Sequence, residues 1–430
     1  MVDGADMHDF ARTLVSAPRS ITGDGVRATL AGVSEQLPLV IHEVPSGTPV
    51  LDWTVPPEWN VREAWLAAPD GTRVVDWSNS PLHLLGYSVP TRGRFDLQAL
   101  QPHLYSLPDR PSLIPYRTSY YTPSWGFCLA DAQRRTLTEG EYEVCIDATF
   151  DDAGSLTYGE AFVPGSEANE ILISTHVCHP AMANDNLSGI AVAAALGAWI
   201  AAEPRRWSYR ILFVPGTIGA ITWLARNRAR TAAIRAGVVL TGLGDRADFT
   251  YKRSRQGSSW TDRVLEYVLR EVDAESRIID FSPYGYDERQ FCSPGFDLPI
   301  GRLTRSPHGE YPEYHTSADN LDFITPTQLG NSLLVLKRAV EIFESDRRYV
   351  NTNPYGEPNL GRRGLYRPVG GAIDQKSVEL GYLWMLSQAD GTRSVLEVAH
   401  KSGVGYDALR DASRALVAAG LLEDAGSGPR

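Results

Sequence analysis

The sequence predicts an α/β protein built on a mostly parallel sheet with flanking helices. Residues 170–346 alternate short apolar runs with longer helical patterns, which is the order expected of strand–helix–strand units. The clearest unit begins with a β-branched run at residues 170–173. It continues into a helix over residues 190–200 that is rich in small apolar residues. A buried strand followed by a buried helix indicates a sheet covered by helices.

Chain length and composition indicate a globular protein of two or three domains. Of the 430 residues, 43% are hydrophobic and 22% are charged, which is ordinary for such proteins. The net charge of −11 disfavours nonspecific binding to nucleic acid or to an anionic membrane. Nucleic acid is therefore not an expected partner. A membrane is not expected either, because no apolar run has the length needed to span one.

The cysteines and the first residues predict a cytoplasmic location. The four cysteines show no Cys-x-x-Cys spacing, which argues against a disulfide scaffold and fits a reducing compartment. The first residues carry acid, whereas a signal peptide begins with a basic segment. The sequence leaves a homo-oligomer open.

Two amphipathic helices are expected at residues 8–16 and 24–36, with a turn and a cap between them. In that turn, Arg19 and Asp24 have two interpretations. They contact substrate, or they attach the loop to the core, and the second interpretation is favoured.

Short strands separated by turn signals follow from residue 37 to about residue 166. Within this region we place an inserted small β-rich domain at residues 51–138. The α/β core then comprises residues 1–50 and 139–350. Its later strands are expected at residues 209–214, 236–240 and 298–301, and its later helices at 219–229, 262–272 and 326–345.

The last part of the chain has the pattern of a winged-helix-like domain. Residues 351–373 are rich in Asn, Pro and Gly and are expected to form a linker. Residues 374–430 then carry six Lys and Arg against eight Asp and Glu. A DNA-reading face needs basic residues, so a packing or partner-docking role is favoured. The helices expected here are at 374–386, 394–401 and 407–419, with a wing starting at 420–424.

Histidine and aspartate residues follow the strand at residues 170–173, at the edge of the sheet where α/β proteins bind ligands. Residues 176–189 read HVCHPAMANDNLSG, so His176 ends the strand and Asp185 lies in a turn before the helix. Imidazole and carboxylate are donors that zinc uses. The alternative is that the histidines are buried structural residues and that the turn only caps the helix. The strand–His–turn–Asp–helix order favours a metal site.

This stretch resembles the first metal-binding segment of the aminopeptidase-like family, the bacterial DUF4910 and DUF2172 groups, which are related to the M28 zinc aminopeptidases. The resemblance implies a zinc-aminopeptidase-like core, a C-terminal winged helix, and His315 as the last histidine ligand. With His176 and Asp185, His315 would give zinc the three protein ligands of a catalytic site. Similar segments cover almost the whole chain, at residues 19–27, 52–59, 120–128, 287–291, 314–320 and 356–358.

The chain departs from its relatives at acidic positions. Gly216 occupies the place of the general-base glutamate, and glycine has no proton acceptor. Loss of a positioned base removes about two to four orders of magnitude of rate. Thr217 and Thr241 stand where M28 enzymes have further acidic ligands. A single zinc ion is therefore expected.

The acid pair Asp287 and Glu288 is the expected substitute for the missing base. It follows a Pro-Tyr-Gly-Tyr turn. The alternative is a solvated turn in which Glu288 and Arg289 face water, but the resemblance of residues 287–291 favours a functional role. Arg289 is accordingly expected beside the substrate.

Further residues are expected to support the metal or the substrate. Asp319 is expected to orient an imidazole, with a turn cap as the alternative. His179 is expected in a supporting position, because Pro180 and the short spacing from His176 limit its reach. An aromatic core is the alternative for residues 120 and 121. The tyrosines expected near the substrate are Tyr120, Tyr121 and Tyr314.

These observations predict a zinc-dependent amide or peptide hydrolase of aminopeptidase type, acting on a small peptide or aminoacyl compound. The competing hypothesis is a metal-binding pseudo-enzyme that recognises a peptide or aminoacyl ligand. Metal activation favours the hydrolase, since it lowers the pKa of bound water even where the glutamate is missing. A DNA-binding regulator acting through the C-terminal domain is a third possibility.

Overall fold

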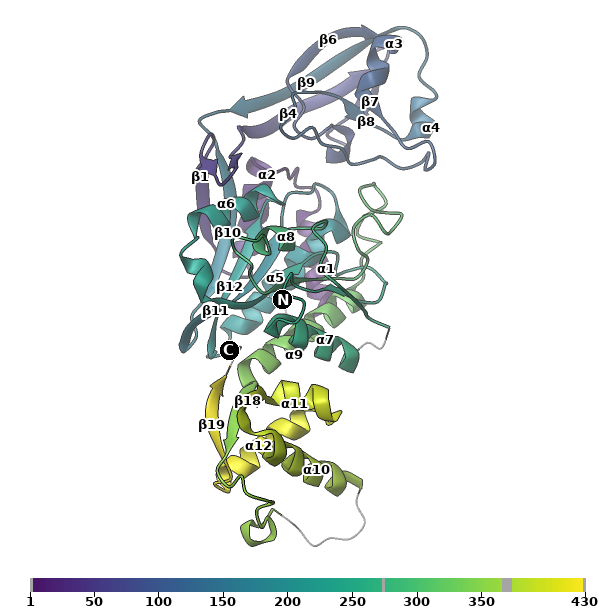
Figure 1. Ribbon diagram of the computed structural model, residues 1–430. Helices are drawn as coiled ribbons and strands as arrows, with labels where there is room; N and C mark the ends of the chain where they lie inside the picture. The colour runs from purple at the N-terminus through teal and green to yellow at the C-terminus, as the bar shows by residue number, and fades with distance from the viewer. Residues whose placement is uncertain (1–2, 273–274, 366–372, 428–430) are drawn as a thin grey trace. The chain divides into compact units, whose positions relative to one another are not determined.

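An eight-stranded mixed sheet organises the larger of two units into which the computed structural model divides (Figure 1). The structure describes residues 3–272, 275–365 and 373–427. The larger unit comprises residues 1–257 and 275–334, and the smaller comprises 258–274 and 335–430. In order across the sheet, the strands are β1 (Val40–Pro45), β10 (Ser155–Val163), β12 (Trp207–Val214), β11 (Glu167–His176), β13 (Ile234–Leu240), β16 (Ile300–Thr304), β14 (Thr250–Lys252) and β15 (Arg277–Ile279).

The centre of this sheet is parallel, as predicted. β11 pairs in parallel with β12 on one side and β13 on the other, and β13 pairs in parallel with β16. Antiparallel pairings join β1 to β10, β10 to β12 and β14 to β16. Since the parallel strands end at the same edge, their C-terminal residues meet there. His176 is the last residue of β11, so it lies at that edge.

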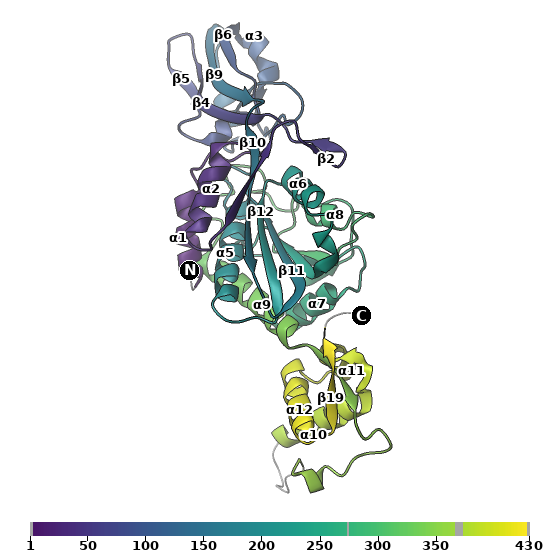
Figure 2. The ribbon, with the colours of Figure 1, turned by 90° about the vertical axis from the view of Figure 1, so that its left-hand side faces the viewer.

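Helices cover both faces of the sheet. Figure 2 shows α1 (Gly4–Leu14), α2 (Asp24–Ser34) and α5 (Gly189–Ala201) on one face, with α6 (Ile218–Arg226) and α8 (Glu288–Phe291) on the other. Residues 189–197 of α5 are all buried. The small side chains of α5 allow this close packing, which is why the segment is apolar around its whole circumference.

A second, antiparallel sheet lies in the same unit. Its order is β5 (Arg73–Asp76), β4 (Glu58–Ala67), β9 (Glu141–Asp151) and β6 (Thr91–Asp96). Because β9 begins at Glu141, this sheet includes a strand that lies outside the range 51–138 expected for the inserted domain. The remaining short elements are β2 (Pro49–Val50), β3 (Trp53–Thr54), α3 (Leu97–Leu100), β7 (Leu104–Tyr105), β8 (Phe127–Cys128) and α4 (Asp131–Arg134).

The smaller unit has helices against a three-stranded sheet ordered β18 (Asp390–Ser394), β17 (Arg347–Asn351) and β19 (Leu422–Ser427). The core boundary expected at residue 350 falls within β17, and residues 366–372 of the expected linker lie outside the described residues. The long helix α9 (Pro326–Ser345) leads into β17. The other helices of this unit are α7 (Trp260–Val272), α10 (Ile373–Gln388), α11 (Val395–Ser402) and α12 (Tyr406–Ala418).

Asp346 links α7 and α11 of the smaller unit by hydrogen bonds. Its buried carboxylate accepts hydrogen bonds from the backbone amide of Leu396 at 3.0 Å and from the Trp260 indole at 3.2 Å. Burial raises the pKa of Asp346 to about 6, and the hydrogen bonds from Leu396 and Trp260 only partly oppose that rise. In the parts of the chain that the structure describes, no helix is long and apolar enough to cross a membrane.

Candidate metal centre

The loop after β11 folds back onto the end of that strand. The Asn186 side-chain amide donates to Oγ1 of Thr175 at 2.7 Å and to the His176 carbonyl at 3.0 Å. Its oxygen accepts from the backbone amide of Gly242 at 3.2 Å. These hydrogen bonds fix the turn that contains Asp185 to the end of β11 and to the residues that follow β13. The turn therefore does more than cap α5.

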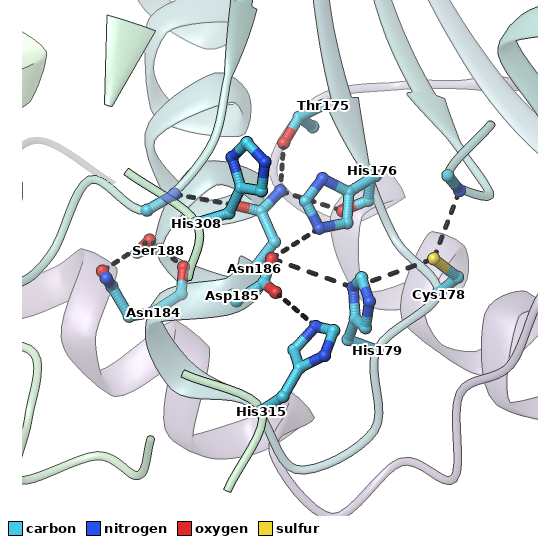
Figure 3. A network of polar contacts seen from close by, with 12 residues as sticks. Thr175, His176, Cys178, His179, Asn184, Asp185, Asn186, Ser188, His308 and His315 are labelled. Carbon is cyan, nitrogen blue, oxygen red and sulfur yellow. Dashed lines mark hydrogen bonds and ion pairs between the residues drawn. The ribbon is translucent and has the colours of Figure 1, made fainter. Parts of the chain in front are cut away.

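Three imidazoles surround the carboxylate of Asp185 (Figure 3). Nε2 of His176 lies 2.8 Å from Oδ1 of Asp185, and Nδ1 of His179 lies 3.8 Å from the same oxygen. Nε2 of His315 lies 3.2 Å from Oδ2. The structure therefore brings His315 to His176 and Asp185, although it lies 130 residues from Asp185 in the sequence.

His179 is closer to this centre than its spacing suggested. Donor atoms of His176, His179 and Asp185 all lie within 4.8 Å of one another, a grouping that suits a metal ion. The expectation that Pro180 limits the reach of His179 is wrong, because the loop turns its ring back toward Asp185. Burial lowers the pKa of His179 to about 3, so its ring is neutral and can offer a lone pair.

Asp185 is ionised although it is completely buried. Burial alone would raise its pKa, but the neighbouring imidazoles of His179, His176 and His315 hold the pKa well below its usual range. A buried carboxylate with several nitrogen donors around it is the arrangement that a cation stabilises.

Asp319 holds the backbone of the turn. Its Oδ1 accepts from the amide of Asn184 at 2.5 Å and its Oδ2 from the amide of Asp185 at 3.0 Å. From the sequence we expected Asp319 to orient an imidazole, with a turn cap as the alternative. The structure instead shows it positioning the carboxylate ligand through the main chain.

His315 is held by the β-rich part of the chain. The Tyr116 amide donates to the His315 carbonyl at 2.8 Å, and Pro115 forms a β-bridge with Thr316. The Tyr116 ring packs edge-on against His179 and His315, with centroids 5.2 Å and 5.0 Å away. Sequence reasoning missed Tyr116, because no motif in residues 114–118 connects that segment with a histidine 200 residues later.

An open cleft adjoins His315. Its volume is about 540 Å³, and it is lined by residues 107–110, 115–118 and 314–316. Tyr314 stacks on His315 with a centroid distance of 3.9 Å. The hydroxyl of Tyr120 lies 3.0 Å from that of Tyr116, whereas Tyr121 is 51% exposed and packs against Trp53. Tyr314 and Tyr120 thus lie at or behind the cleft, and Tyr121 lies on the surface.

Asp287 is hydrogen-bonded to the loop that carries Gly216. The Thr217 amide donates to its Oδ1 at 2.6 Å, while its Oδ2 is buried without a hydrogen-bond partner among the described residues. Burial raises the pKa of Asp287 to about 6. The preceding residue, Tyr286, stacks on His176 with centroids 4.9 Å apart. A Cβ on Gly216 would lie 3.7 Å from Cβ of His176, so this loop borders the metal centre.

The two residues of the acid pair have different surroundings. Glu288 is completely buried and forms an ion pair with Lys252, with Nζ 2.5 Å from Oε1, and Nη1 of Arg302 lies 3.9 Å away. Lys252 lies on β14, a strand that the sequence analysis did not find. Neither oxygen of Glu288 has a hydrogen-bond partner of good geometry among the described residues, so what distinguishes the two is the Lys252 cation beside Glu288 and the Thr217 amide bound to Asp287. Arg289 contributes to the electrostatics of Asp287 and lowers its pKa slightly against the effect of burial.

His308 is a further histidine that sequence reasoning missed. Its ring centroid lies 4.9 Å from that of Tyr286, and its Nδ1 lies 3.2 Å from Nη1 of Arg302. Burial lowers the pKa of His308 to about 4, with Arg302 adding to the effect.

Comparison with known proteins agrees with this architecture. Residues 8–346 match the family described as Domain of unknown function (DUF4910), and residues 347–424 match a winged helix-turn-helix family. A Clostridium acetobutylicum protein, provisionally named a polysaccharide biosynthesis protein with an aminopeptidase-like domain, is 42% identical over 98% of this chain and 96% of its own length.

Solved structures give the same result. A crystal structure of a provisionally assigned peptidase from Clostridium acetobutylicum is 41% identical, covers 98% of this chain and 96% of its own, and has a TM-score of 0.92. A zinc aminopeptidase from Bacillus subtilis shares the fold at 12% identity, with a TM-score of 0.57 over 80% of this chain and 95% of its own. The chain thus belongs to the aminopeptidase-like DUF4910 family, with a winged helix-turn-helix at its C-terminal end.

Proposed function

We propose that the protein is a zinc-dependent amide hydrolase of aminopeptidase type, acting on a small peptide or aminoacyl compound. The observation that carries this proposal is the position of Asp287. Its carboxyl is hydrogen-bonded to the loop that carries Gly216, the neighbouring Tyr286 stacks on His176, and its Oδ2 has no hydrogen-bond partner among the described residues.

The donors around Asp185 fit a zinc ion. Each oxygen of this buried carboxylate faces an imidazole Nε2, one from His176 and one from His315. Three protein ligands of this kind are typical of catalytic zinc. We propose His176, Asp185 and His315 as these ligands, with His179 as a neutral neighbour, because His315 adjoins the open cleft from which a substrate would enter. When bound, zinc supplies a lowered pKa of water and polarises an amide carbonyl.

Asp287 would handle the proton. Because the Thr217 amide occupies Oδ1, Oδ2 is the atom that takes a proton from the attacking water. The same atom would then deliver that proton to the amine nitrogen as the C–N bond breaks. A general base works best when its pKa lies near the working pH, and the pKa of Asp287 is about 6. A carboxyl at its ordinary pKa would accept the proton less readily.

Aromatic side chains would hold the substrate. Tyr116 and Tyr314 border both the open cleft and the His315 ring. The hydroxyl of Tyr120 supports that of Tyr116 from behind. Their flat faces suit contact with a peptide or aminoacyl group.

Zinc titration and a substrate panel test the proposal together. The metal-free full-length protein is titrated with zinc, and hydrolysis of aminoacyl amides, anilides and dipeptides is then measured. We expect about one zinc ion per chain and turnover of at least one substrate class, lost in the Asp287→Asn variant. Zinc binding without turnover, together with ligand binding that Asp287→Asn leaves unchanged, would favour the pseudo-enzyme instead.

A further inference from the structure

A buried arginine without a carboxylate partner lies next to the metal centre. The side chain of Arg19 is in a residue only 2% exposed. Its Nε donates to the His179 carbonyl at 2.8 Å, and its Nη1 donates to the Leu14 carbonyl at 2.5 Å. Within the described part of the chain, no Asp or Glu forms an ion pair with Arg19. The guanidinium is therefore fixed in place but its charge is not neutralised.

One nitrogen of this guanidinium remains available. Nη2 of Arg19 is buried and has no hydrogen-bond partner among residues 3–272, 275–365 and 373–427. The hydroxyl of the adjacent Ser20 is also buried, and its neighbour is the hydroxyl of Tyr120. Burial lowers the pKa of Arg19 to about 10, so the group is still cationic at neutral pH. An unpaired buried cation is costly, and an anion that reaches it recovers that cost.

Both residues line a small, partly open cavity. Its volume is about 80 Å³, and its walls include Trp59, Trp77 and Tyr116 as well as Arg19 and Ser20. One carboxylate, Asp24, also borders the cavity, but it is highly exposed and pairs with Arg27 at 3.0 Å. The cavity thus places the single cation of Arg19 among aromatic walls, with Asn60 as a further polar residue, which suits a small group of single negative charge.

We propose that this cavity is a subsite for a carboxylate of the ligand, bound by Nη2 of Arg19 and the hydroxyl of Ser20. The proposal rests on the proposed function and narrows it, since it selects amides that carry a free carboxylate close to the bond to be cleaved. Arg19 contacts the main chain of His179, and Tyr116 lines this cavity as well as the cleft beside His315. A carboxylate is favoured over a dianion, because the cavity offers a single cation.

Binding of a matched ligand pair to zinc-free protein tests the subsite without requiring turnover. The probes are N-acetylglycine and its neutral counterpart N-acetylglycinamide, measured by ligand-observed NMR and by thermal shift on the full-length chain. We expect the carboxylate to bind at least tenfold more tightly than the amide. Arg19→Met should abolish that preference, and Arg19→Lys should retain part of it.

A matched control uses an exposed arginine of the open cleft. Arg110 lines that cleft, so Arg110→Met removes a nearby cation but leaves the cavity intact. This variant should keep the carboxylate preference. Equal binding of both probes by the wild-type protein would overturn the proposal, and so would a preference that survives in a folded Arg19→Met variant or that is lost in Arg110→Met. If Arg19→Met does not fold, the wild-type preference and the Arg19→Lys variant decide.

The two proposals can fail separately. A carboxylate preference that depends on Arg19 in a protein that neither binds zinc nor hydrolyses amides would uphold the subsite and refute the hydrolase. Amide hydrolysis with no preference for substrates that carry a carboxylate would uphold the hydrolase and refute the subsite.

Discussion

The backbone amide of Thr217 donates a hydrogen bond of 2.6 Å to Oδ1 of Asp287, and this contact joins two loops that are 70 residues apart. Thr217 has a φ of +62°, a left-handed conformation that costs free energy for a β-branched residue. That conformation turns the Thr217 amide toward the carboxylate. The loop that carries Gly216 and Thr217 therefore holds the carboxylate of Asp287.

Replacement of Asp287 should remove activity without removing zinc. The Asp287→Asn variant keeps the shape of the side chain but cannot accept the proton. We expect kcat to fall by about two to four orders of magnitude, as is typical for loss of a general base. Steady-state kinetics and zinc content measure the two effects. A variant that retains wild-type kcat would exclude Asp287 as the base.

Replacement of Glu288 should act on stability. Glu288→Gln leaves Lys252 as a buried cation without its partner. Removal of one partner of a buried ion pair typically costs about 3 to 5 kcal/mol. The free energy of unfolding, measured by denaturant titration, should decrease accordingly, while Asp287→Asn should change it much less. If Glu288→Gln and Asp287→Asn both lose activity and keep their stability, Glu288 shares the general-base role that we assign to Asp287 alone.

A glutamate at position 216 should compensate for loss of Asp287. A Cβ there lies 3.2 Å from Sγ of Cys178, so the sulfur must move by only a few tenths of an ångström. We expect the double variant Gly216→Glu, Asp287→Asn to be at least tenfold more active than Asp287→Asn alone. The matched control is Gly216→Ala, Asp287→Asn, which adds the Cβ without a base and should recover nothing. Equal rates for the two double variants would contradict the prediction.

Substitution of the imidazoles should rank them as zinc ligands. His176→Gln and His315→Gln should each lower zinc affinity by at least tenfold, because each removes a donor beside Asp185. His179→Gln should have a smaller effect. His308→Gln is the control, since that residue lies beyond Tyr286. Competition with a chromogenic chelator measures these affinities. A larger loss of zinc affinity in His179→Gln than in His315→Gln would make His179 the ligand and His315 the neighbour.

The smaller unit should lose stability as the pH rises through the range of Asp346. Burial raises the pKa of this carboxyl from 3.8 to about 6, so its stabilising contribution is fully present below pH 4 and is lost as the pH rises to about 6. A difference of roughly two pKa units corresponds to about 3 kcal/mol. Urea unfolding at several pH values should show this decrease. The Asp346→Asn variant should show less of it, and an unchanged pH profile would contradict the assignment.

The full-length protein should not bind duplex DNA in a salt-dependent manner. Its C-terminal residues from 374 onward have more acidic than basic side chains. Binding that neutralises phosphates requires Lys or Arg and weakens steeply with salt. Fluorescence anisotropy with a labelled duplex at low and moderate salt measures this. Clear binding at low salt would assign the winged helix to DNA.

Local sequence predicted the parts of the site that one strand–helix unit carries. His176 and Asp185 flank the turn between β11 and α5, so periodicity and turn chemistry were sufficient to place them. His315 required resemblance, because the fold brings it to Asp185 from 130 residues away. The Glu288–Lys252 pair was not predictable, since β14 has only three residues and shows no period. The role of Asp319 could not be predicted either, because it binds main-chain amides, and such bonds leave no pattern of side chains in the sequence.

The pairing of residues 114–117 with the His315 loop has an evolutionary consequence. The Tyr116 amide and the Pro115 bridge fix the backbone that carries the histidine. A lineage that lost or exchanged residues 114–117 would therefore also release one of the proposed metal-binding groups. We infer that residues 114–117 and the proposed metal site must be inherited together. In family members that lack the equivalent of residues 114–117, the residue at the position of His315 should vary.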